Sequence, residues 1–123
     1  MKLTVYEYAK CGTCRKAVKW LKEQGYELNI IPIVESPPSA EELSNLISIS
    51  GLELKKWFNT SGEVYKALSL KDKLPSMSEA EQIELLASNG KLLKRPIVTD
   101  GKRVTVGFKE EMYQENWATA SAH

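Results

Sequence analysis

Two cysteines, Cys11 and Cys14, are the residues best suited to chemistry in this 123-residue chain, and they are its only cysteines. They stand three apart in the stretch CGTC, a spacing that serves metal binding, structural disulfides and thiol–disulfide exchange. A structural zinc site needs four ligands, typically with a second pair of cysteines or histidines. The only histidine is the last residue, His123. The composition therefore disfavours zinc and leaves two interpretations, a working thiol pair or two inert buried cysteines.

The local sequence favours a working thiol at Cys11. Residues 3–8 read as a strand, and an apolar stripe that begins at Cys14 predicts a helix that ends at Gly25. Cys11 then lies at the helix N-terminus, where unpaired backbone N–H groups and the helix dipole stabilise an anion. Positive charge is added nearby by Lys10, Arg15 and Lys16. We therefore expect the pKa of Cys11 to lie below about 8.5, and Cys14 to resolve a mixed disulfide.

The stretch LLKRPIVTD, residues 92–100, is the second informative segment. Pro96 opens a predicted strand, where a missing backbone N–H does little harm. It is read equally well as an ordinary edge proline or as a cis proline that turns the chain and brings Arg95 toward the thiols. Spacing alone leaves both interpretations open.

The elements that position these residues follow the order β-α-β, a block of helices, and β-β-α. Strands are expected at 3–8, 27–34, 95–100 and 102–108, with a hairpin turn at Asp100-Gly101. In the block, helices are expected from Ser39 to about Gly51, at 52–58, at 63–70 and after Ser78, with capping boxes Ser39/Glu42 and Ser78/Glu81. A last helix is expected at 109–117. Because only parallel pairs need a crossover, this order predicts a four-stranded mixed sheet.

Composition narrows the function classes. Seventeen basic and sixteen acidic side chains give a net charge of +1, so no global basic excess favours direct nucleic-acid binding. No apolar run is long enough to span a membrane or to act as a signal peptide, and we expect a cytoplasmic protein. A reducing cytosol makes a catalytic or redox-sensing thiol pair more plausible than a structural disulfide. No Gly-rich phosphate loop or Cys-His pair is present, and no cofactor or metal is expected.

Together these motifs resemble the arsenate reductase (ArsC)/Spx family of thioredoxin-fold proteins over essentially the whole length. The stretches that carry the resemblance are CGTCRKA, ESPPSAEELSNL, FNTSGEVYKAL and LLKRPIVTDGKRVTVGF. The resemblance implies a thioredoxin-like α/β domain over residues 1–118, with a helical insertion at about 38–90 between the second and third strands. Residues 119–123 are expected to form a frayed tail.

The resemblance also implies roles for individual residues. Cys11 is expected to attack the substrate, Cys14 to resolve the intermediate, and Arg95 to bind an oxyanion. The residues expected to contact substrate are Gly12, Thr13, Arg15 and a cis Pro96. Glutaredoxin-linked arsenate reductases, however, have serine at the Cys14 position and two further arginines. By alignment those arginines fall at Asn59 and near Val106 or Gly107, so we expect weak activity on arsenate unless Lys102 or Arg103 substitutes.

Two functions follow from the resemblance. The first is a thiol–disulfide oxidoreductase that uses glutaredoxin or thioredoxin as its electron donor. The second is a redox-switched regulator, similar to Spx, that binds the C-terminal domain of the RNA polymerase α subunit.

Overall fold

The computed structural model describes residues 2–8 and 10–118, and its strands form a four-stranded sheet. The strands are β1 (Lys2–Glu7), β2 (Glu27–Pro32), β3 (Ile97–Thr99) and β4 (Val104–Val106). Their order is β2-β1-β3-β4, with β1 and β2 parallel and the other two pairs antiparallel. The predicted thioredoxin-like α/β fold with a mixed sheet is therefore confirmed. Pro32 is the last residue of the edge strand β2, where its missing N–H does little harm.

The hairpin between β3 and β4 forms at Asp100-Gly101, as predicted, with a four-residue loop rather than a two-residue turn. The Oδ1 atom of Asp100 accepts hydrogen bonds from the N–H groups of Lys102 and Arg103, at 2.8 and 2.7 Å. Gly101 has a φ of +91°, a conformation that glycine adopts without steric penalty.

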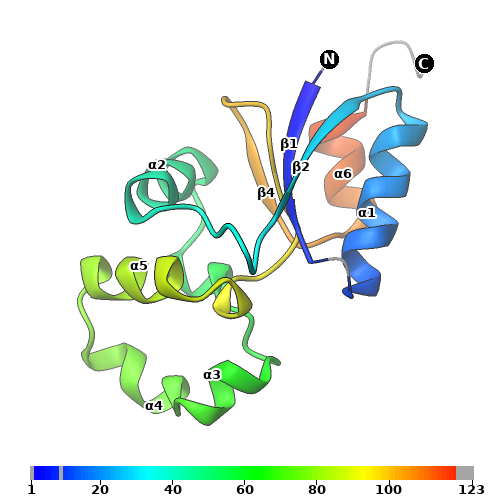
Figure 1. Cartoon of the computed structure of the whole chain (residues 1–123). Coiled ribbons are helices and arrows are strands. Elements are labelled where there is room, and N and C mark those ends of the chain that lie inside the picture. The colour runs from blue at the N-terminus through cyan, green and yellow to red at the C-terminus, as the bar shows by residue number, and fades with distance from the viewer. Residues whose placement is uncertain (1, 9, 119–123) are drawn as a thin grey trace. The chain divides into compact units, whose positions relative to one another are not determined.

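One face of the sheet is covered by α1 (Gly12–Glu23) and α6 (Glu110–Trp117), which lie side by side in Figure 1. Their apolar faces and the sheet share one core, whose fully buried members include Leu3, Val5, Leu21, Tyr113 and Trp117. The Nε1–H of Trp117, which is buried in this core, donates to Thr105 Oγ1 at 2.9 Å. This packing fixes α1, and with it the cysteine pair, on the end of β1.

The chain divides into two compact units, one formed by residues 1–32 with 95–123 and the other by residues 33–94. The second unit contains α2 (Ala40–Ser50), α3 (Glu63–Ala67), α4 (Leu70–Lys73) and α5 (Glu79–Ser88), with α2 packed against α5. It also has three single turns of 3₁₀ helix: η1 (Leu54–Trp57), η2 (Leu74–Ser76) and η3 (Gly90–Leu92). These helices form the expected insertion between β2 and β3.

Local sequence signals set several boundaries in the second unit. Ser39 and Ser78 accept the N–H groups of Glu42 and Glu81, so both predicted caps are present, and Ser78 with Glu81 completes a capping box. Gly51 ends α2 with a φ of +68°.

Two predictions about helices in this unit were wrong. Residues 52–58 form only the 3₁₀ turn η1, and residues 63–70 do not form one helix. Ser69 has a φ of +53°, which interrupts the helical path and separates α3 from α4.

No helix in the described part of the chain is long and apolar enough to cross a bilayer. The prediction of a single domain over 1–118 stays a prediction, and the predicted tail at 119–123 lies outside the described residues.

Candidate active site

The junction between β1 and α1 places Cys11 at the N-cap of the helix, as predicted. Its backbone is extended, with φ −92° and ψ 117°, and its N–H donates to the carbonyl of Tyr8 at 2.9 Å. Its own carbonyl accepts the N–H of Arg15 at 3.2 Å. No acidic residue occupies the first turn of α1. The N–H groups at this helix end are therefore available to the sulfur of Cys11 rather than to a carboxylate.

Several neighbours favour the thiolate of Cys11. Partial burial is the largest single influence and opposes ionisation, but the favourable neighbours together outweigh it and lower the pKa of Cys11, the backbone N–H and the thiol of Cys14 first among them. The N–H of Thr13 and the positive charge of Arg95 lower this pKa further. Cys11 is only partly buried, so the stabilised thiolate remains open to a reactant.

Cys14 has the opposite environment. Its side chain is 0% exposed, and burial raises the pKa of its thiol to about 12. The negative charge of Cys11 adds to this rise, because two thiolates at one site repel each other. The N–H of Tyr8 donates to Cys14 Sγ at 3.5 Å. One turn of helix thus separates an activated thiol from one that stays protonated at neutral pH.

Arg95 reaches the same site from the segment just before β3. Its guanidinium carbon lies 4.8 Å from the centre of the Tyr8 ring, a cation–π contact. Within the described residues its buried Nη1 atom has no hydrogen-bond partner. An arginine held by an aromatic face keeps its N–H donors for an incoming anion, whereas one paired with a carboxylate does not.

The remaining predicted substrate-binding residues have different positions. Gly12 and Thr13 are exposed in the first turn of α1, and a Cβ atom on Gly12 would have no neighbour within 4 Å. Pro96 is buried and follows a cis peptide bond, which decides between the two interpretations of this proline. Arg15 is exposed and lines a groove with Glu7 and Val18.

The sheet register shows which residues share the end of the sheet that leads to Cys11. Tyr6 pairs with Ile97, and Ile97 pairs with Val106, so Val106 and Pro96 lie at this end. The N–H of Gly107 donates to the Pro96 carbonyl at 2.9 Å. The position near Val106 or Gly107, where the resemblance to arsenate reductases implies a further arginine, is therefore beside Pro96.

The loop of the β3–β4 hairpin is at the opposite end of the sheet, beyond the pair Thr4 and Thr99. Arg103 is engaged there, at 3.6 Å from Asp100 and with its guanidinium carbon 5.2 Å from the Trp117 ring centre. This placement removes Arg103 as a substitute for the lost arginine. Lys102, in the same loop, is at the same distant end.

Sequence reasoning did not identify Tyr8 as part of the site. Tyr8 both contacts the guanidinium of Arg95 and donates its N–H to Cys14, yet a tyrosine at the end of a strand carries no signal of this. Among residues 2–8 and 10–118 no three His, Cys, Asp or Glu side chains gather as a metal site would require.

Comparison with known proteins shows which proteins are similar to this chain. A model of the ArsC family matches residues 6–116. The uncharacterised protein YusI of Bacillus subtilis strain 168 is 64% identical over 118 residues, which cover 96% of this chain and all of that protein. The regulatory protein MgsR of the same strain is 34% identical over 86% of this chain and 82% of its own length. The structure of an arsenate reductase from Vibrio cholerae is similar with a TM-score of 0.84 and 31% identity, covering 94% of this chain and 97% of that one.

Proposed function

Because the chain belongs to the ArsC/Spx family and carries a pair of unlike thiols, we propose that it is a thiol–disulfide oxidoreductase. The family includes arsenate reductases. The observation that carries the proposal is the contrast between the two cysteines. Cys11 is accessible with a lowered pKa, and Cys14 is buried with a pKa of about 12. This is the arrangement that an attacking thiol and a resolving thiol need.

The reaction begins with the thiolate of Cys11. It attacks one sulfur of a substrate disulfide, forms a mixed disulfide, and expels the other sulfur as a thiolate that takes a proton from solvent. Cys11 then carries no charge, so its repulsion no longer adds to the rise in the pKa of Cys14 that burial causes. Cys14 loses its proton to solvent and attacks the Cys11 sulfur, which releases the second substrate thiolate. The substrate disulfide is reduced to two thiols, and the protein is left with a Cys11–Cys14 disulfide.

An external dithiol must reduce this disulfide before the next cycle, and glutaredoxin or thioredoxin would serve as that donor. Such a cycle fits the reducing cytoplasm, where we place the protein. In the attack, Arg95 stabilises the Cys11 thiolate, and Gly12, Thr13, Arg15 and Pro96 surround the incoming sulfur.

Arsenate is expected to be a poor substrate because two anions must meet at Cys11. Removing one charged hydrogen-bond donor typically costs about 1.5–3 kcal/mol. Two missing arginines would slow the attack by roughly two to four orders of magnitude. The register supports this expectation, since Val106 occupies the end of the sheet near Pro96 and the cations of the hairpin lie at the far end. A neutral disulfide needs no such charge neutralisation.

The test is turnover of arsenate and of hydroxyethyl disulfide, each with glutaredoxin and with thioredoxin as the donor. We expect measurable reduction of the disulfide. The kcat/KM for arsenate should lie at least about a hundredfold below that of an arsenate reductase that has the two further arginines, which is the lower end of the range argued above. The Cys14→Ser variant should accumulate a mixed disulfide at Cys11, detected by intact-mass spectrometry, and should stop turning over. Efficient arsenite production with micromolar KM would overturn the expectation for arsenate. Equal turnover by Cys14→Ser and the wild type would overturn the resolving role.

A second candidate, a redox-switched regulator, is favoured by the 34% identity to the regulatory protein MgsR. Oxidation to the Cys11–Cys14 disulfide would be its switch, and the C-terminal domain of the RNA polymerase α subunit its partner. Pull-down with that domain, using reduced and oxidised protein, separates the two candidates. Retention in one redox state only would favour the regulator, and no retention in either state would exclude it.

A further inference from the structure

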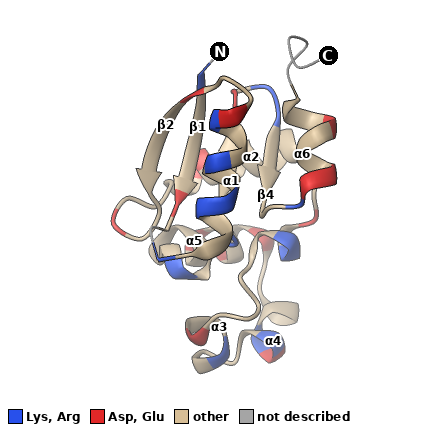
Figure 2. Ribbon diagram, turned by 90° about the vertical axis from the view of Figure 1, so that its right-hand side faces the viewer, with Lys and Arg blue, Asp and Glu red and all other residues tan. Residues whose placement is uncertain are grey.

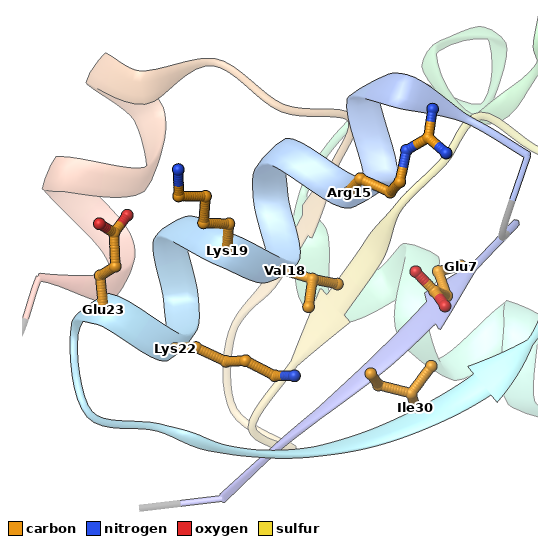
Figure 3. Close-up of a pocket in the computed structure, with 7 residues that line it drawn as sticks. All are labelled: Glu7, Arg15, Val18, Lys19, Lys22, Glu23 and Ile30. Carbon is orange, nitrogen blue, oxygen red and sulfur yellow. The ribbon is translucent and has the colours of Figure 1, made fainter.

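The first unit contains a groove of about 590 Å³ beside the proposed active site, and of its lining residues only Arg15 has a part in the thiol chemistry proposed above. Figure 3 shows that α1 forms one wall and that β1 and β2 form the other. Val18 from α1 and Ile30 from β2 give it an apolar floor. Ile30 is 39% exposed, so that its side chain is accessible to a molecule lying in the groove.

The wall formed by α1 is basic. Arg15, Lys19 and Lys22 line the groove, and their spacing of four and three residues places them on one face of the helix. At 1.5 Å per residue the three side chains span about 10 Å of the helix axis. Within the described residues none of them has an ion-pair partner. Figure 2 shows basic residues on successive turns of the same helix, with acidic Glu23 at its end.

The groove begins next to the reactive thiol. Arg15 is its first basic residue, and the N–H of Arg15 donates to the carbonyl of Cys11 at 3.2 Å. A molecule lying along the groove would therefore end about one helical turn from the Cys11 sulfur. A ligand at this place is positioned to deliver a disulfide to Cys11.

We propose that this groove docks an acidic, partly aliphatic segment of the protein whose disulfide Cys11 attacks. The inference rests on the proposed function and adds the class of substrate. Two carboxylates two residues apart on an extended chain are separated by about 7 Å, which is close to the rise of about 6 Å along α1 between Arg15 and Lys19. An aliphatic side chain between or beside them would cover Val18 and Ile30.

Two carboxylates that line the groove disfavour anionic ligands other than a short acidic peptide. Glu7 stands on β1, across from α1, and Glu23 lies at the last turn of α1. A uniformly charged polymer, such as nucleic acid, or an anionic membrane would bring negative charge against both. A short peptide can place its carboxylates on the α1 side alone, and a peptide is therefore the occupant that the charge distribution favours.

Binding without any thiol reaction tests the docking site directly. The probe is a synthetic peptide without cysteine, Glu-Leu-Glu-Leu-Asp, added to ¹⁵N-labelled wild-type protein and followed by heteronuclear NMR. We expect chemical-shift changes concentrated at Val18, Lys19, Lys22 and Ile30, weakened by 0.5 M NaCl. The doubly substituted Lys19→Gln/Lys22→Gln variant should lose most of them. A matched control, Lys71→Gln/Lys73→Gln on α4, makes the same charge change outside the groove and should retain them.

The chemistry is tested separately with a mixed disulfide of the same peptide, extended by one cysteine that carries thionitrobenzoate. Wild type should release thionitrobenzoate at least about fivefold faster from this peptide than from a Gln-Leu-Gln-Leu-Asn version. The Lys19→Gln/Lys22→Gln variant should lose that preference but reduce hydroxyethyl disulfide at the wild-type rate.

The outcomes distinguish the two ideas. Equal rates for the acidic and neutral peptides, with hydroxyethyl disulfide still reduced, would overturn the docking site and leave the proposed function intact. Failure to reduce any disulfide, with the peptide still bound in the groove, would overturn the function alone. Equal or stronger shifts at the groove with a single-stranded oligonucleotide or with phosphatidylglycerol vesicles would overturn the assignment to a peptide.

Discussion

Selective alkylation of Cys11 is the most direct measure of the site. The perturbation is a change of pH between 5 and 9 in the presence of iodoacetamide, which reacts with thiolates and not with thiols. Because the pKa of Cys11 is lowered and burial raises that of Cys14 to about 12, the two cysteines should react at very different rates.

The size of the difference follows from the two environments. Since the pKa of Cys11 lies below that of an ordinary thiol, the two values differ by at least about three units. Between pH 5 and 8 the thiolate fraction of Cys11 then exceeds that of Cys14 by at least about a thousandfold. A thiolate of lower pKa is intrinsically less nucleophilic, which offsets about twentyfold of this advantage. A ratio of at least about 50 remains, and the complete burial of Cys14 increases it.

The assay uses light and heavy iodoacetamide, proteolysis and mass mapping, so that both cysteines are followed in one sample. The Cys11→Ser variant shows whether Cys14 labels when it is alone. Protein unfolded in urea is the control, because both cysteines should then react alike with midpoints near 8.5. Equal labelling of the two cysteines in the native protein, each with a midpoint near 8.5, would refute the reasoning.

Two further predictions concern the support of the site and the packing of the second unit. Tyr8→Leu removes the ring beneath Arg95 and should slow alkylation of Cys11 at pH 7 by about twofold, as expected for a cation–π contact of about 0.5 kcal/mol. Tyr8→Phe keeps the ring and should be alkylated at the wild-type rate. An equal fall in the alkylation rate in both variants would rule out the ring contact. Gly90→Ala would push a Cβ atom into the backbone of Ile33, so urea unfolding should show a free energy of unfolding lower by about 1–3 kcal/mol or more. In the control Gly12→Ala the new Cβ atom meets no atom within 4 Å, and the free energy of unfolding should not fall. Equal stability of the two variants would contradict the packing argument.

The sheet and its main helices were predictable because their signals are local. The two serine caps, the glycine at the end of α2 and the Asp100-Gly101 turn are each read from a few neighbouring residues. The break between α3 and α4 was not predictable in this way. EVYKALSL has good helical periodicity, and nothing in its residue types indicates the left-handed conformation of Ser69.

The candidate site, too, was predictable from the sequence only in part. The position of Cys11 at a helix N-terminus follows from the alternation of β1 and the stripe of α1, and it was confirmed. The contact between Tyr8 and Arg95 joins residues 87 positions apart, and only the pairing of β1 with β3 brings them together. A contact of this kind depends on strand register, which a single sequence indicates only coarsely.

The reactive thiol, the resolving thiol and the proposed docking groove depend on three different parts of α1. Its N-terminal N–H groups face Cys11, its buried side carries Cys14, and its exposed side carries Lys19 and Lys22. Substitutions on the buried side change the core and the resolving thiol together, because Cys14 is packed at 0% exposure. Substitutions of the exposed lysines remove neither a core contact nor a helix N–H group. The choice of partner is therefore the property of this helix that sequence change can alter without altering the chemistry of the thiols.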